Sequence, residues 1–276
     1  MRWYRWLSVT LAVVLVGALS SAATPGQAQL SSDVARLRVQ VLERYPHDPT
    51  AFTQGLELHD GLMYESTGLY GSSDVRVVVP ETGQVLTQVP LAAHFFGEGL
   101  TIVEDRILQL TWQENVAMIR DRGTLAEQGL FNYQGEGWGL CYDQPRDRLV
   151  MSNGSAELTF RDPDTFEPAG TVAVTLDGQA LPMLNELECV GDRVWANVWL
   201  TDQIVRIDPA TGVVDAVVDA SGLLTGREAT AADVLNGIAA VPDSDTFMIT
   251  GKLWPWMFKV RFVGLGWSTQ TTIAHG

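Results

Sequence analysis

One glutamate, one lysine, several amides and several tryptophans in this sequence stand where short apolar segments begin or end. Five of them begin such a segment: Gln54, Glu98, Trp138, Asn185 and Asn236. Four others follow the end of the next segment: Trp112, Asn153, Trp199 and Lys252. A carboxyl group can accept and return a proton, amides and an ammonium can orient a polar ligand, and indole faces bury apolar groups and attract cations. This combination is typical of a small-ligand site with acid/base chemistry.

Glu98 is the candidate acid or base of this set. Gly97 and Gly99 flank it and leave its backbone open, and Phe95 and Phe96 can desolvate the carboxyl and raise its pKa. Each candidate also has a purely structural interpretation. Glu98 is an acid in a turn, Lys252 a solvated loop cation, and Asn153 the start of an Asn-Gly-Ser turn, while Trp195 is as well suited to core packing as to a ligand.

Other classes of chemistry have little support in the sequence. The histidines His47, His59, His94 and His275 are scattered, and neither a His-Glu-x-x-His pattern nor a Cys-x-x-Cys pair occurs, which argues against catalytic zinc. A Gly-x-Ser-x-Gly elbow and a phosphate-binding P-loop are also absent. The net charge of −15 argues against binding to nucleic acid or anionic lipid.

A repeated unit accounts for the spacing of these residues. Each copy begins with a polar or aromatic residue, followed in most copies by Gly and then by an aliphatic residue. A short strand, an acidic turn and a second apolar strand follow. The aliphatic anchors Leu56, Leu100, Leu140, Leu187 and Ile238 are 44, 40, 47 and 51 residues apart, the length of a four-stranded propeller blade. The sequence therefore predicts an all-β, five-bladed propeller, in which the first strands and the ends of the second strands converge on one channel mouth.

The last repeat lacks one strand, because it ends after the segment 256–262. The segment 38–43 precedes the first repeat and is predicted to supply the missing outer strand, closing the ring and removing exposed edges. A two-sheet sandwich is the alternative fold, but it does not explain a repeat of this length.

The N-terminus has the layout of a secretory signal peptide: Arg2 and Arg5, an apolar run over 7–19, and small residues over 20–29. We expect cleavage after Ala28 and export to the periplasm or beyond, with an uncleaved anchor as the alternative. The predicted organisation is a signal peptide over 1–28, a propeller domain over 38–263 and a C-terminal tail over 264–276.

The two cysteines, Cys141 and Cys189, occupy matching positions in neighbouring repeats. Export places them where disulfides form. A disulfide and a pair of buried, unpaired thiols are both compatible with this placement.

Six strings in order resemble the plant and bacterial glutaminyl cyclase family over roughly 39–262. They are Phe-Thr-Gln-Gly-Leu at 52–56, Phe-Gly-Glu-Gly-Leu at 96–100, Leu-Thr-Trp at 110–112, Gly-Trp-Gly-Leu at 137–140, Asn-Glu-Leu-Glu at 185–188 and Asn-Gly-Ile-Ala at 236–239. Each stands at the start of a blade or the end of a strand. The family fold is a five-bladed propeller, in agreement with the repeat count. Cys141 and Cys189 depart from the Thr or aromatic residue expected at their positions.

The resemblance implies roles for individual residues. Glu98 would be the general acid/base, and Asn185 and Lys252 would bind and polarise the substrate amide. Lys259 lies near Lys252 and is the alternative lysine. The glutamine pocket would be formed by Gln54, Phe96, Trp112, Trp138 and Trp199.

The implied function is an acyltransferase that cyclises the N-terminal glutamine of peptides or proteins to pyroglutamate with release of ammonia. The reaction would need no metal or redox cofactor, although a structural calcium ion in the axial channel is known in some relatives. The expected partners are peptides with N-terminal Gln. Binding to nucleic acid is not expected, nor is binding to a membrane after signal cleavage. The expected oligomeric state is a monomer. The alternatives are a non-catalytic exported propeller that binds peptides at its Trp-lined mouth, and a metal-dependent, lactonase-like hydrolase.

Overall fold

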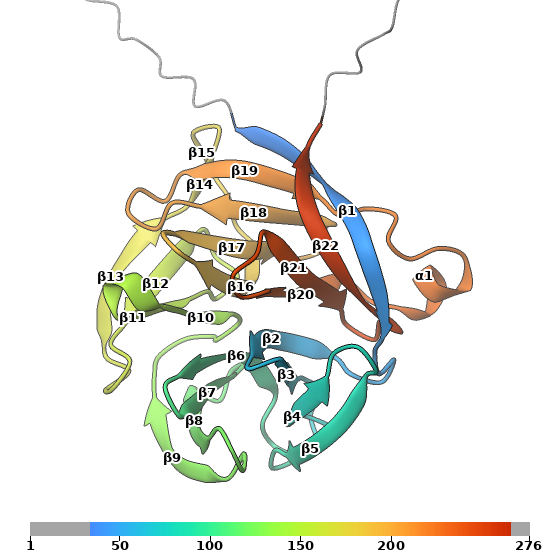
Figure 1. Cartoon of the computed structure of the whole chain (residues 1–276). Helices are drawn as coiled ribbons and strands as arrows, with labels where there is room; N and C mark the ends of the chain where they lie inside the picture. Colours follow the sequence, from blue (N-terminus) through green and yellow to red (C-terminus); the bar gives the residue numbers. More distant parts are fainter. Residues whose placement is uncertain (1–33, 266–276) are drawn as a thin grey trace, which may run out of the picture. The chain divides into compact units, whose positions relative to one another are not determined.

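The computed structural model describes residues 34–265, and most of them lie in β-strands (Figure 1). Three sheets have four strands each. They contain β2 (Thr53–His59), β3 (Leu62–Thr67), β4 (Asp74–Val79) and β5 (Gln84–Pro90); β6 (Gly97–Val103), β7 (Arg106–Thr111), β8 (Val116–Asp121) and β9 (Glu127–Asn132); and β10 (Leu140–Asp143), β11 (Arg148–Met151), β12 (Glu157–Arg161) and β13 (Pro168–Ala173). In each sheet the strands pair in chain order and antiparallel, as the repeats predict.

A fourth sheet has eight strands in the order β16-β17-β18-β19-β1-β22-β21-β20. Its members are β16 (Leu184–Val190), β17 (Arg193–Val198), β18 (Gln203–Ile207), β19 (Val214–Asp219), β20 (Leu235–Ala240), β21 (Thr246–Gly251), β22 (Trp256–Gly264) and β1 (Ala35–Pro46). The remaining elements are short: β14 (Thr175–Leu176) pairs with β15 (Gln179–Ala180), η1 (Gln144–Arg146) is one 3-10 turn, and α1 (Arg227–Ala231) is one helical turn. The described fold is therefore all-β, as predicted.

The first described strand, β1, pairs with the last, β22, and Figure 1 shows the two side by side. It pairs antiparallel with β22, from Leu37 opposite Gly264 to Pro46 opposite Trp256, which confirms the outer strand predicted from the segment 38–43. The strand starts at Ala35, earlier than predicted, and β22 continues to Gly264, where the tail was predicted to begin. Residues 35–38 also pair in parallel with β19, which the sequence did not predict.

The first strand of each repeat contacts its neighbours in the cyclic order β2, β6, β10, β16, β20 and again β2. Glycines in the repeated strings allow this close approach. A Cβ on Gly99 would lie 2.7 Å from the backbone nitrogen of Leu140, and one on Gly139 would meet the carbonyl of Asn185. The Gly of the repeated string is thus required where neighbouring inner strands pass each other.

Among the described residues, apolar side chains pack in five clusters, four between neighbouring sheets and one within the eight-stranded sheet. One cluster contains Trp195, whose ring lies 5.1 Å from Phe247 and 5.0 Å from Phe262. Trp195 therefore packs in the core, one of the two roles that the sequence left open. Met63 and Met248 are likewise buried in the core.

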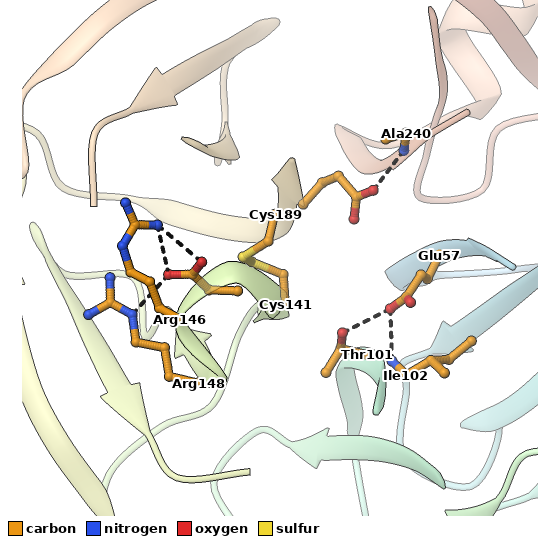
Figure 2. The surroundings of a disulfide bond; sticks show 10 residues. Glu57, Thr101, Ile102, Cys141, Arg146, Arg148, Cys189 and Ala240 are labelled. Carbon is orange, nitrogen blue, oxygen red and sulfur yellow. Dashed lines mark hydrogen bonds and ion pairs between the residues drawn. A yellow bond between two sulfur atoms is a disulfide. The ribbon is translucent and has the colours of Figure 1, made fainter. Parts of the chain in front are cut away.

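Three glutamates connect the inner strands by accepting backbone N–H groups, of which Glu186 and Glu188 are buried and Glu57 is half-buried. Glu186 accepts from Leu56 at 3.3 Å and from Ile238 at 2.8 Å. Glu57 accepts from Ile102 and from the Thr101 hydroxyl, both at 2.9 Å, as Figure 2 shows. Glu188 accepts from Ala240 at 2.8 Å. Burial raises the pKa of all three carboxyls, that of Glu57 to about 7.

Cys141 of β10 and Cys189 of β16 form a disulfide between strands of neighbouring sheets, which decides between the two states compatible with the sequence (Figure 2). Their Cα atoms are 5.4 Å apart and they are 48 residues apart in the chain. Closing a loop of this length stabilises a fold by about 4 kcal/mol in the chain-entropy description. The disulfide therefore holds together two inner strands that lie in different sheets.

The predicted signal peptide lies outside the described residues, as does the tail beyond Leu265. Within 34–265, no helix has the length and apolar character needed to cross a bilayer.

Candidate active site

All eight residues predicted for the site line one cavity of about 250 Å³. Its lining consists of Phe52, Gln54, Leu69, Phe96, Glu98, Trp112, Trp138, Asn185, Trp199 and Lys252. Phe52 and Leu69 were not predicted, although Phe52 stands in one of the repeated strings. The structure therefore brings the predicted residues together, while their individual roles stay predictions.

The repeated strands explain why residues from five repeats meet in one place. Gln54, Glu98 and Asn185 lie near the start of the inner strands β2, β6 and β16. Trp112, Trp199 and Lys252 each come directly after the second strand of a repeat, at the ends of β7, β17 and β21. Because consecutive strands are antiparallel, the end of the second strand returns to the start of the first. The cavity is therefore built at one edge of the inner strands.

Glu98 is the one carboxylate in the cavity lining. Its side chain is buried, with the residue 4% exposed, and its Oε1 accepts a hydrogen bond from Gln54 Nε2 at 3.0 Å. Burial raises the pKa of Glu98 well above its usual value, with Lys252 opposing the rise and Glu136 and Glu114 adding to it. A carboxyl with a raised pKa can exchange a proton at a pH close to neutral.

Asn236 acts from behind the cavity. It was predicted to converge on the mouth, but it is fully buried and does not line the cavity. Its Nδ2 donates to the Thr53 carbonyl at 3.0 Å and to Gln54 Oε1 at 3.2 Å. Gln54 in turn donates to Glu98, so Asn236 fixes which way the Gln54 amide points.

Lys252 lies in the cavity lining and is only 4% exposed, so the interpretation as a solvated loop cation is wrong. Its Nζ lies 4.8 Å from the centroid of the Phe52 ring, at cation–π distance. Burial lowers the pKa of Lys252, and the charge of Glu98 opposes this. The alternative, Lys259, lies in β22, where it pairs with Glu43 at 3.4 Å and lines a different cavity.

Asn185 presents a buried side-chain oxygen to which no partner within residues 34–265 is hydrogen-bonded. Buried polar atoms are almost always hydrogen-bonded in folded proteins, so an unpaired one needs an explanation. Asn185 also lines the cavity. A ligand with a polar N–H group would satisfy this oxygen.

Aromatic rings form the rest of the wall. Phe96 packs edge-to-face on Trp112 at 5.5 Å, and Trp138 packs edge-to-face on Trp199 at 5.3 Å. Gly154 lies against Trp138, where a Cβ would approach the indole to 2.6 Å. The adjacent Asn153 is not in the lining, and its Oδ1 accepts from the backbone N–H and hydroxyl of Ser155, so it serves the turn that follows β11.

The arrangement supplies one proton acceptor, one cation, one unpaired amide and an apolar wall. These groups can bind a small polar molecule with an apolar stem, transfer its proton and stabilise a developing negative charge. Among the described residues, no group of three or more His, Cys, Asp or Glu side chains is placed to hold a metal ion.

Comparisons with known proteins relate the chain to one family. The family model described as glutamine cyclotransferase matches residues 11–262. The chain is 38% identical to a glutaminyl-peptide cyclotransferase of Arabidopsis thaliana, over 229 residues that make up 81% of this chain and 71% of the relative. The crystal structure of a glutaminyl cyclase from Myxococcus xanthus is similar with a TM-score of 0.76 and 39% identity, covering 84% of this chain and 99% of that one.

Proposed function

Because the chain belongs to the glutamine cyclotransferase family, we propose that it cyclises the N-terminal glutamine of peptides to pyroglutamate and releases ammonia. The observation that carries the proposal is the placement of Glu98, a buried carboxyl with a raised pKa, in a cavity walled by indoles. That cavity is suited to a small side chain that carries an amide.

In the proposed reaction the neutral α-amine attacks the γ-carboxamide carbon of the same residue. A new N–C bond forms, the Glu98 carboxylate takes a proton from the attacking nitrogen, and the C–N bond of the carboxamide breaks. Glu98 returns the proton to the departing nitrogen, which leaves as ammonia. One carboxyl thus acts first as base and then as acid, for which a pKa above the usual carboxyl range is favourable.

Asn185 and Lys252 would stabilise the tetrahedral intermediate. Donors aimed at the oxygen that becomes negative lower the barrier, and they act most strongly in a site that excludes water. The Asn185 amide lines the cavity, where its Nδ2 would be the donor and its unpaired Oδ1 would accept an N–H of the substrate, and the Lys252 ammonium is held over Phe52. A negative charge on the intermediate would also favour the protonated form of Lys252, against the effect of burial.

The aromatic wall would hold the substrate side chain in a folded conformation. A glutamine side chain must curl until its γ-carbon meets its own amine. Confining it between Phe96, Trp112, Trp138 and Trp199 reduces the other conformations open to it. Gln54, which is fixed by Asn236, would keep Glu98 aimed at the attacking nitrogen.

We infer that five blades surround this site. The three four-stranded sheets are one blade each, and the eight-stranded sheet is two blades joined where β1 pairs with β19. The cyclic contact of the five inner strands supports this count.

We further propose that the reaction needs no metal ion, because Glu98, Asn185 and Lys252 together supply the proton transfer and the charge stabilisation. A calcium ion in the axial channel, which the resemblance allows but no carboxylate cluster of the sequence supports, would then be structural. Export and a monomeric state rest on the sequence alone and stay predictions.

The proposal is tested by incubating the purified chain with a peptide that begins with Gln and measuring ammonia. The same peptide with an acetylated α-amine is the substrate control, because it lacks the nucleophile. We expect ammonia only from the free peptide, with no loss of activity on adding a chelator, and a large decrease in Glu98→Gln. Peptide binding without ammonia release would instead support the non-catalytic alternative and overturn the proposal.

A further inference from the structure

One carboxylate outside the cavity lining links the two halves of the aromatic wall. Glu136 lies between β9 and β10, and its Oε2 accepts hydrogen bonds from two indole N–H groups. The Trp112 Nε1 donates at 2.9 Å and the Trp138 Nε1 at 3.0 Å. The other oxygen, Oε1, accepts from Gln113 Nε2 at 2.9 Å. Both oxygens of Glu136 are therefore engaged.

The two indoles belong to different sheets. Trp112 follows β7 and packs on Phe96, whereas Trp138 precedes β10 and packs on Trp199. Each aromatic pair packs edge-to-face, and Glu136 accepts a hydrogen bond from one indole of each pair. An indole has a single polar atom, so a hydrogen bond to Nε1 fixes the rotation of the ring.

The charge of Glu136 also reaches the cavity. Partial burial raises the pKa of Glu136, but hydrogen bonds from Gln113, Trp138 and Trp112 outweigh it and hold the pKa below its usual value. Glu136 is therefore ionised near neutral pH, and hydrogen bonds to an ionised acceptor are stronger than neutral ones. Its negative charge in turn contributes to the raised pKa of Glu98.

Glu114 provides a contrast on the same rim. It also raises the pKa of Glu98, but its carboxylate accepts from the Tyr70 hydroxyl at 2.9 Å and from the Phe96 backbone N–H at 3.4 Å. Glu114 therefore raises the pKa of Glu98, as Glu136 does, but it is not hydrogen-bonded to an indole.

We propose that Glu136 is a positioning residue, which fixes the Trp112 and Trp138 indoles relative to each other and so sets the width of the glutamine pocket. It acts through the indoles and does not touch the reacting atoms. The inference rests on the proposed function for its substrate, but the placement of the indoles can be tested without catalysis.

Two substitutions separate geometry from charge. Glu136→Ala removes both the acceptor oxygens and the charge, whereas Glu136→Gln keeps one acceptor oxygen, replaces the other with an NH2 group and removes the charge. For a Gln-initiated peptide, we expect Glu136→Ala to raise KM about tenfold while lowering kcat less, because the loss of the hydrogen bonds to both indoles loosens the pocket. Glu136→Gln should restore KM to within about threefold of wild type. Glu157→Gln, at an exposed position of β12, removes the charge of a residue that neither lines the cavity nor is hydrogen-bonded to either indole, and it should behave as wild type.

The charge effect has its own readout. Without the negative charge of Glu136, the pKa of Glu98 is less raised, so the acidic limb of the pH profile of kcat should move to lower pH in Glu136→Gln. Glu157→Gln should leave that limb in place.

Near-UV circular dichroism tests the positioning directly. The indole bands of Glu136→Ala should weaken while its far-UV spectrum stays that of wild type, and Glu136→Gln should keep the bands. If Glu136→Ala keeps both its indole bands and its KM, or if only its thermal stability changes, the inference is overturned. If wild type releases no ammonia, the proposed function fails, and the indole bands still decide the inference about Glu136.

Discussion

Two groups of buried glutamates in this protein differ in what their oxygens contact. Glu98 at the cavity has a single hydrogen-bond donor, the side-chain amide of Gln54, and lines open space. Glu186 on the inner strands uses both oxygens to accept backbone N–H groups of β2 and β20. Burial raises the pKa of both carboxyls well above the usual value. A raised pKa therefore does not by itself identify a catalytic acid, and the difference lies in which partners occupy the oxygens.

The surrounding charges sharpen the same contrast. Glu98 faces Lys252, which counteracts the rise of its pKa. Glu186 faces only further carboxyls, Glu188 and Glu57, which add to the rise. Lys252 thus opposes the effect of burial on the pKa of Glu98, whereas the carboxyls around Glu186 add to that effect.

After substitution of Glu98 itself, the largest expected effect is that of Lys252→Met, which removes the one cation in the cavity lining. Loss of an oxyanion-stabilising donor lowers kcat by about 10²–10³-fold. Stability should change little, because a buried, unpaired charge is replaced by an apolar side chain of similar length. Ammonia release and thermal unfolding measure the two effects. A variant with wild-type kcat would contradict the proposed role of Lys252 in stabilising the oxyanion.

The inner-strand carboxyls should control stability through pH instead. The pKa of Glu57 is raised to about 7, above its unfolded value near 4.5, so the native state binds a proton more tightly than the unfolded state. Its contribution to the free energy of unfolding is fully present below about pH 4.5 and is lost as pH rises through about 7.

Glu57→Gln removes the loss of stability that accompanies ionisation of Glu57. Relative to wild type, the variant should gain on the order of 1–3 kcal/mol between about pH 4.5 and pH 8. Denaturant unfolding at several pH values measures the difference, with Glu157→Gln as the exposed control. A difference that stays constant with pH would show that Glu57 does not titrate in this way.

Glu186→Gln should cost about 1–3 kcal/mol of stability, because one of the two backbone N–H groups loses its acceptor. Ammonia release per folded molecule should stay within a few-fold of wild type, since Glu186 does not line the cavity. Urea unfolding together with the ammonia assay checks both statements. Wild-type stability would mean that the inner strands do not depend on this carboxylate.

An effect smaller than that of Lys252→Met is expected for Gln54→Ala, which removes the one side-chain donor to Glu98 among residues 34–265. The hydrogen bond stabilises the ionised carboxyl, so its loss should raise the pKa of Glu98 further and lower kcat/KM about tenfold at neutral pH. The acidic limb of the pH profile should move to higher pH. A shift to lower pH would contradict the assignment of Gln54 as the donor.

Much of the site could be predicted because its residues repeat with the strands. The strings around Gln54, Glu98 and Asn185 begin inner strands, and Trp112, Trp199 and Lys252 follow second strands, so the period of the repeat places them together. The closing strand was predicted for a similar reason, since the last repeat lacked a strand that the segment 38–43 could supply.

What the sequence did not reveal depends on contacts between distant segments. Leu69 and Glu136 stand in loops outside the repeated strings, so no period indicates them. Asn236 occupies the position that the repeat predicts, yet its amide is hydrogen-bonded to Gln54 and does not line the cavity. The parallel pairing of β1 with β19 requires the register of two strands far apart in the chain. Cys141 and Cys189 were placed in matching positions, but their pairing depends on a Cα separation that sequence spacing does not give.

The most direct test compares Glu98→Gln with Glu186→Gln in one assay of ammonia release from a Gln-initiated peptide, normalised to the folded fraction. Both variants lose one buried carboxyl of raised pKa. The account predicts a decrease of about 10²–10⁴-fold for Glu98→Gln and a rate within a few-fold of wild type for Glu186→Gln. Equal rates in the two variants would contradict the claim that Glu98 transfers the proton.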